Sequence, residues 1–325
     1  MMTPAVSPLN SAGGGNILGF NIGSNQVLAV YGSLSGLVFE KISLPTSREG
    51  GFAQLSETLV QMADRLLTIT QAQHLPTPDR VSICVSADIE NTTGEIVASE
   101  DFPEWKHVPI RSQLASRFNL PVYLEESANA GALAEVYFGQ GQSRRNVVFI
   151  NLTPTVRAGI FSEGRIFRGQ GGSAGKIGSF KRKMESAAHE EKDSSLNVLA
   201  SASGMLRLAL CRHSGHWPED VALLDVINGA IEGDPFAVEV FQESGRALGK
   251  ALAPLTHLLG PEVIIIGYPG CLLGEVLLAP LRDALQQESG LSGDALPLLA
   301  ASGLGARLPE LQAIAAAIHA AKGGT

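Results

Sequence analysis

Residues 121–139, PVYLEESANAGALAEVYFG, constrain the fold more than any other stretch of this chain. A short apolar run at its start predicts a β-strand, and the Ala-rich run that follows predicts a helix ending at Gly139. Between them lies an acidic turn of Glu125, Glu126 and Ser127. Open α/β sheets bind ligands at the carboxyl ends of their strands. The turn therefore predicts a ligand site, with an α/β half of the chain on either side.

Strands and helices alternate along the rest of the chain, which predicts an α/β class. Apolar runs predict strands at residues 17–31 (a hairpin with its turn at 23–26), 36–44, 80–86, 146–152, 156–162 and 262–267. Helical spacing predicts helices at residues 52–70, 110–118, 274–287 and 309–321, and a largely helical region at 196–259. A Gly-rich bend is expected at 169–178, and an exposed polar insertion at 181–195.

Composition and charge limit the classes of protein that this chain fits. Its 325 residues allow two domains, and a hydrophobic content of 45% predicts a globular chain. The net charge of −8 disfavours binding to nucleic acid or to an anionic membrane, and no apolar run is long enough to span a bilayer. Three scattered cysteines indicate a reducing, cytoplasmic setting. Residues 1–16 are expected to form a flexible leader without a secretory signal.

The order and spacing of several segments resemble the ROK family of repressors, open reading frames and sugar kinases. The segments that carry the resemblance are residues 102–109 (FPEWKHVP), 121–139, 164–178 and 260–270. The resemblance implies a two-domain actin-like ATPase (ribonuclease H-like) fold with an interdomain cleft. It implies domains at 17–120 and 121–308, with helix 309–321 packing back on the first domain through its apolar face. Active members of the family transfer phosphate from ATP to a sugar hydroxyl.

On the nucleotide side, this chain departs from the family's motifs. In the first phosphate loop Asn21 replaces the acid that helps to hold magnesium, while Gly23 is kept and Asn25 follows it. A neutral amide does not balance a divalent cation. The family's second loop is rich in glycine, but here it contains Pro154, Thr155 and Arg157, which remove a backbone donor and add bulk. The glycines on the adenine side are reduced to Gly267 and Gly270, and Tyr268 between them is either a stacking or a capping aromatic.

The sugar side departs as well. Ser127 occupies the position of the family's general base, and a hydroxyl does not accept a proton at neutral pH. The adjacent Glu126 is an alternative base, but successive residues at a strand end point to opposite faces. The structural interpretation of Ser127 is a helix N-cap. Asn129 completes this turn.

The second sugar motif of the family, Glu-x-Gly-His, becomes Lys176 to Ser179, and the later sugar-binding glutamate becomes Asn197. Zinc is not expected, because Ser179 replaces the histidine ligand and residues 180–195 contain no cysteine. Loss of acids at four positions leaves a site that suits a sugar phosphate or another anionic sugar derivative better than a neutral hexose. A separate Cys211-Arg-His-Ser-Gly-His216 run has metal-like spacing, with a frayed helix end as its alternative.

Three functions remain as hypotheses. The first is a catalytically inactive sugar-kinase-like protein, a pseudokinase, which binds a ligand or a regulatory partner without any expected cofactor. The second is a sugar kinase with an altered active site, which requires ATP and magnesium. The third is a sugar-responsive repressor, which the short segment before the first strand and the negative charge disfavour. The resemblance also implies a homodimer formed through the second domain.

Overall fold

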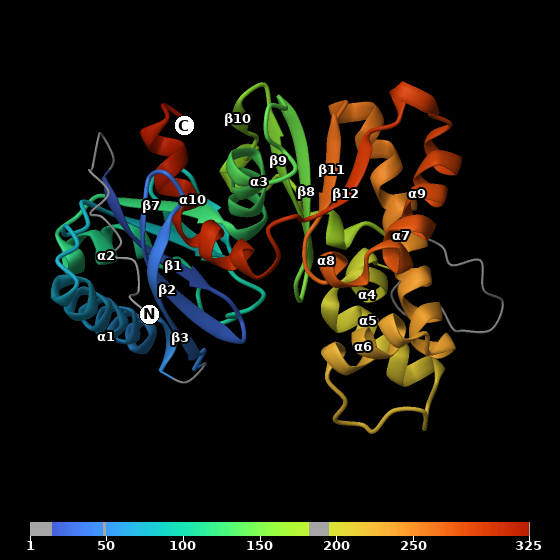
Figure 1. Ribbon diagram of the computed structural model, residues 1–325, viewed down its shortest axis with the longest axis horizontal. Helices are drawn as coiled ribbons and strands as arrows, with labels where there is room; N and C mark the ends of the chain where they lie inside the picture. Colours follow the sequence, from blue (N-terminus) through green and yellow to red (C-terminus); the bar gives the residue numbers. More distant parts are fainter. Residues whose placement is uncertain (1–14, 48–49, 182–194, 325) are drawn as a thin grey trace, which may run out of the picture.

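The computed structural model describes residues 15–47, 50–181 and 195–324, and within them two five-stranded sheets alternate with three layers of helices (Figure 1). The predicted leader, except for its last two residues, and most of the predicted insertion lie outside the described residues. No helix within the described ranges is long and apolar enough to cross a membrane.

The first sheet has the strand order β3-β2-β1-β4-β7. Its strands are β1 (Asn16–Ile22), β2 (Gln26–Ser33), β3 (Val38–Pro45), β4 (Arg80–Val85) and β7 (Val122–Glu126). The predicted hairpin is confirmed by the antiparallel pairing of β1 with β2. Helices α1 (Gly51–Ala72) and α2 (Ile110–Phe118) cover the outer face, at the left of Figure 1.

Strand β7 changes the expected domain boundary at residue 120. It pairs in parallel with β4, from Val81↔Val122 to Val85↔Glu126, so the first sheet continues through Glu126. Hydrogen bonding across the sheet decides this membership, and the local pattern of residues 121–139 does not contain it. The carboxyl ends of β1, β4 and β7 meet at one edge because these strands are parallel.

The second sheet has the order β10-β9-β8-β11-β12. Its strands are β8 (Asn146–Leu152), β9 (Val156–Ser162), β10 (Arg165–Ile166), β11 (Val263–Ile266) and β12 (Leu298–Ala301). The sequence patterns did not predict β10 or β12, which are short. The outer face is covered by α4 (Leu196–Ala200), α5 (Ala202–Arg212), α6 (Leu223–Glu232), α7 (Pro235–Leu259), α8 (Gly270–Leu273) and α9 (Glu275–Ser289).

Helices α3 (Ser127–Phe138) and α10 (Leu308–Ala321) form the layer between the sheets. Successive side chains of a strand point to opposite faces of the sheet, so one strand contributes to the cores on both faces. Val148 and Ile150 of β8 enter the outer core, whereas Val147 and Phe149 pack in the middle core with α3 and α10. Helix α10 contacts β1, β2, β4 and β7 of the first sheet and also α3, so it lies against both halves of the chain.

Gly159 permits the close approach of α3 to β9. A Cβ atom at this position would lie 2.0 Å from the carbonyl oxygen of Ala128, in the first turn of α3. Any side chain there would push the helix off the strand. The first turn of α3 is therefore held directly on the second sheet, while its preceding strand belongs to the first.

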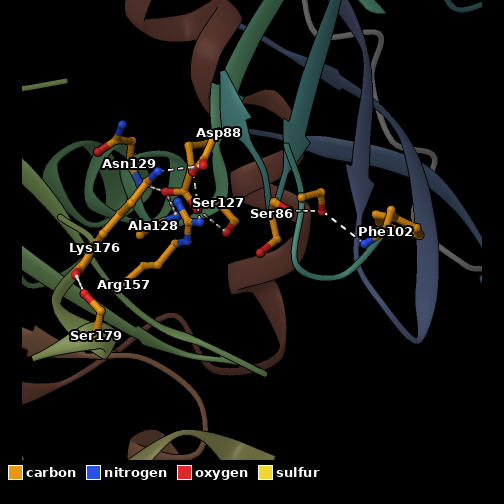
Figure 2. Close-up of polar contacts among 11 residues, drawn as sticks. Ser86, Asp88, Phe102, Ser127, Ala128, Asn129, Arg157, Lys176 and Ser179 are labelled. Carbon is orange, nitrogen blue, oxygen red and sulfur yellow. Dashed lines mark hydrogen bonds and ion pairs between the residues drawn. The ribbon is translucent and has the colours of Figure 1, made fainter. Parts of the chain in front are cut away.

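A small hairpin of β5 (Asp88–Glu90) and β6 (Glu95–Ala98) projects from the end of β4. Ser99 Oγ donates to the carbonyl oxygen of Ser86 (2.9 Å) and accepts from the N–H of Phe102 (3.1 Å), which closes the base of the hairpin (Figure 2). Phe102 in turn stacks on Trp105 in the first core, with ring centroids 4.1 Å apart. The apolar runs of the sequence predicted no strand at these positions.

Candidate functional site

The acidic turn stands where β7 of the first sheet passes into α3. Glu126 is the N-cap of α3: its Oε2 accepts from the N–H groups of Ala128 (2.7 Å) and Asn129 (3.3 Å). The interpretation of Ser127 as the cap is wrong, because Ser127 is the first residue of the helix itself. Its Oγ donates instead to Glu126 Oε1 (2.8 Å). A negative side chain at a helix N-terminus is favourable, since it meets unpaired N–H groups and the positive end of the dipole.

Glu125 has a different set of partners. Its Oε2 accepts from Arg168 Nη2 (2.6 Å) and its Oε1 accepts from Asn129 Nδ2 (2.9 Å). Arg168 follows β10 of the second sheet, so this ion pair joins the two halves of the chain. The sequence analysis expected Glu126 and Ser127 to point to opposite faces, but Ser127 Oγ donates to Glu126 Oε1, so these two side chains meet. Both glutamates are buried and hydrogen-bonded.

Asp88 brings together two basic residues that the sequence analysis assigned to different motifs. Its Oδ1 accepts from Arg157 Nη2 (3.0 Å) and its Oδ2 accepts from Lys176 Nζ (2.6 Å). Figure 2 shows both basic side chains converging on Asp88, with the start of α3 beside them. Arg157 lies on β9 and Lys176 precedes a short turn at Ile177–Ser179, whereas Asp88 belongs to the first half of the chain. We call Asp88, Arg157 and Lys176 the interdomain ion cluster.

Burial and charge act in opposite directions on the groups around this cluster. Burial raises the pKa of Glu126, although Arg157, Ser127 and the capped N–H groups oppose the rise. Burial lowers the pKa of Arg157, but the carboxylates of Glu126 and Asp88 outweigh it, so that the pKa ends above its usual value. Arg157 is therefore a permanent cation held between two acidic residues.

A second network, made of hydrogen bonds, connects Asn21 on the predicted nucleotide side to Ser127, which occupies the position of the family's general base. Asn21 Nδ2 donates to the carbonyl oxygen of Pro309 (3.1 Å) and to Gln312 Oε1 (3.3 Å), both in α10. Gln312 Nε2 donates to the carbonyl oxygen of Ser127 (2.9 Å), and Asn151 Nδ2 donates to Ser127 Oγ (3.3 Å). Asn21, where the family has its magnesium-side acid, thus binds a helix of its own chain.

The remaining predicted site residues have local roles. Asn197 Oδ1 accepts from the N–H of Val156 (2.7 Å) and fixes the start of β9, while Ser179 Oγ donates to the carbonyl oxygen of Lys176 (3.1 Å). Thr155 is buried in the β8–β9 turn. The other four predicted residues use backbone groups in turns that follow β1 and β11: Gly23, Asn25, Gly267 and Gly270.

Several residues of the site were missed by the sequence analysis. Asp88 and Arg168 complete the ion pairs between the halves, and Asn151 and Gln312 complete the network around Ser127. A usable signal existed for Asp88, since it follows a predicted strand that ends at the ligand edge. Gln312 had none, because it stands in an Ala-rich helix far along the chain.

Both histidines of the metal-like run at 211–216 lie beside acidic side chains. His216 Nε2 lies 2.7 Å from Asp234 Oδ2, and His213 Nε2 lies 3.5 Å from Glu239 Oε2. Among the residues that the structure describes, no group of three or more His, Cys, Asp and Glu side chains is arranged to hold a metal ion.

Known proteins resemble this chain over most of its length. A model of the ROK family matches residues 17–289. A glucokinase of Halalkalibacterium halodurans is 29% identical over 280 residues, which cover 82% of this chain and 84% of that protein. A xylose repressor of Caldicellulosiruptor bescii is 26% identical over 289 residues, which cover 85% of this chain and 71% of the repressor.

Among solved structures, a ROK family glucokinase from Streptomyces griseus in complex with glucose and AMPPNP has a TM-score of 0.78 at 22% identity. The likeness covers 94% of this chain and 99% of the glucokinase chain. At this identity the structural likeness shows the fold. The expected two-domain, actin-like architecture is therefore confirmed.

Proposed function

This chain belongs to the ROK family, and we propose that it is a sugar-kinase-like protein that binds an anionic sugar derivative and does not transfer phosphate from ATP. One observation carries the proposal. At the position of the family's general base, the Ser127 hydroxyl donates a hydrogen bond to Glu126, and the Glu126 carboxylate is already occupied by two N–H groups of α3. A base must accept the proton of the sugar hydroxyl, and neither group is placed to do so.

The anionic ligand class follows from the charges of the site. Lys176 replaces an acidic residue of the family motif, and Arg157 stands nearby on β9. A cationic pair favours phosphate or carboxylate oxygens, whereas a neutral sugar needs acceptors for its hydroxyl groups. A calorimetric titration tests this part of the proposal. Tight binding of glucose by the protein, with no affinity for anionic sugars, would contradict it.

An altered sugar kinase is the alternative, and the raised pKa of Glu126 favours it. A carboxylate with a pKa nearer to neutrality is a better general base, and Ser127 Oγ lies within hydrogen-bond distance of it. ATP and magnesium would then be required. The residues fit magnesium poorly, because Asn21 is neutral and its amide nitrogen binds Pro309 and Gln312.

A coupled kinase assay across hexoses and their amino and N-acetylated forms tests the two functions. We expect no turnover by the unmodified protein above a Ser127→Ala control, and none by Ser127→Asp. Restoring a base supplies at most about 10²–10⁴-fold of rate, and Asn21 and the Pro154–Arg157 turn remain altered. Turnover by the unmodified protein that is lost in Glu126→Gln would establish the kinase instead.

We also propose that the protein binds no zinc, acts in the cytoplasm and forms a homodimer. The zinc proposal rests on Ser179 and on the absence of cysteine from residues 180–195. Elemental analysis of purified protein is expected to find far less than one zinc per chain, and a stoichiometric amount would refute it.

A further inference from the structure

The interdomain ion cluster has the form of a two-cation site that already holds an anion. Arg157 and Lys176 bind different oxygens of one carboxylate, at 3.0 and 2.6 Å. Two cations commonly engage the oxygens of a ligand phosphate or carboxylate in the same way. In this chain the carboxylate is supplied by Asp88, which comes from the other half of the molecule.

The β5–β6 hairpin, which carries Asp88, is held in place by contacts that do not involve the charge of Asp88. Ser99 and the stacked Phe102 and Trp105 close the base of the β5–β6 hairpin. The next residue of the hairpin, Ile89, lies against the Gly-rich bend, where a Cβ atom on Gly172 would be 2.2 Å from the Ile89 carbonyl oxygen. The backbone therefore presents Asp88 to the two cations, and removal of its charge leaves the hairpin in place.

Exposure shows from which side a ligand reaches the cluster. The side chain of Arg157 is 8% exposed and that of Asp88 20%, whereas that of Lys176 is 39% exposed. Arg157 also feels the charge of Glu126, so one acidic partner stays beside it when Asp88 leaves. Lys176 is the open end of the site, and its Nζ depends on Asp88 for its carboxylate partner.

We propose that Asp88 is an internal substitute for the anionic group of the ligand, and that a hexose monophosphate displaces it from Arg157 and Lys176. The inference rests on the proposed function and adds the residue that controls access. A phosphate monoester brings more negative charge and more acceptor oxygens than one carboxylate, which is why it competes with Asp88. Displacement also breaks the ion pairs that Asp88 makes with the second half of the chain.

The test is a calorimetric titration of the full chain with glucose 1-phosphate, glucose 6-phosphate, glucose and inorganic phosphate. Asp88→Asn keeps the shape of the side chain and removes the competing charge, so we expect about tenfold tighter binding of a hexose monophosphate. Asp79→Asn is the matched control, because Asp79 pairs with its neighbour Arg80 within the first half of the chain. It is expected to leave the affinity unchanged.

Lys176→Met provides a second, independent variant, since its side chain is partly exposed and its loss should not impair folding. It is expected to weaken hexose monophosphate binding at least tenfold, and to cancel the gain in Asp88→Asn when the two are combined. Unchanged affinity in Asp88→Asn or in Lys176→Met would overturn the inference while leaving the proposed ligand class intact. If no protein in the series binds an anionic sugar, both the ligand class and the inference fall. Equal affinity of Asp88→Asn for inorganic phosphate and the sugar phosphates would support displacement by the anionic group alone.

Discussion

Two buried glutamates near the layer of helices between the sheets differ in how their charged forms are stabilised. Glu126 lies near a cation and accepts hydrogen bonds from helix N–H groups. Glu135 of α3 is fully buried, and no cation contributes to the shift of its pKa. Burial raises the pKa of Glu135, and hydrogen bonds from Ser302 and from the N–H of Gln140 only partly oppose this. The charge of Glu135 therefore destabilises the folded state at neutral pH.

The expected consequence is a pH-dependent stability. Because the folded pKa of Glu135 lies above its ordinary value of 4.5, the folded state binds the proton more tightly than the unfolded state. Stability is fullest below the unfolded pKa and falls as the pH rises through the folded pKa. Glu135→Gln keeps an acceptor for Gln140 and a partner for Ser302, so its denaturation midpoint should lose this part of the pH dependence. The exposed Glu104→Gln is the control, and an unchanged pH profile in Glu135→Gln would refute the assignment.

At the scale of elements, the contact of α3 with β9 holds the acidic turn on the second sheet. The turn ends a strand of the first sheet, and its helix rests on the second, so the position of Glu126 and Ser127 depends on both. Gly159 is the point of closest approach, with room for no side chain.

Gly159→Ala should therefore destabilise the protein by about 1–3 kcal/mol, as overpacking in a core typically does. Chemical denaturation monitored by circular dichroism measures the change. Gly229→Ala is a matched control, since a Cβ atom there would have its nearest neighbour at 3.6 Å inside helix α6. It is expected to stabilise the protein by about 0.5–1 kcal/mol. Equal effects of the two substitutions would contradict the close approach.

At the scale of the whole molecule, an apolar surface on the second half of the chain supports the proposed homodimer. Leu224 and Ile231 are 50% and 58% exposed, and they stand seven residues apart on one face of α6. Phe236 at the start of α7 is also exposed. Large apolar side chains exposed on one helix face are candidates for a protein interface.

Ile231→Glu should convert the dimer to a monomer, because a charge at the centre of an apolar interface is left without a partner. Light scattering at micromolar concentration measures the mass directly. Leu258→Glu is the control, since Leu258 is 77% exposed near the far end of the 25-residue helix α7. A monomeric unmodified protein, or a dimer that survives Ile231→Glu, would remove this interface.

The sequence by itself determined most of the long elements and the chemical departures from the family. Apolar periodicity located β1, β2, β4, β8, β9 and β11 and the long helices, because period and propensity are local properties of the chain. Motif spacing identified the positions of Ser127, Arg157 and Lys176, and their changed residue types indicated a changed ligand.

Tertiary structure alone decided which of these residues meet. Asp88 and Lys176 are 88 positions apart, and their ion pair exists because α3 and α10 pack the two sheets against one layer of helices. Hydrogen bonding between strands assigns β7 to the first sheet and β12 to the second, and the backbone at the end of β7 makes Glu126 the cap in place of Ser127. Such pairings depend on the relative placement of distant strands, which no local pattern of side chains contains.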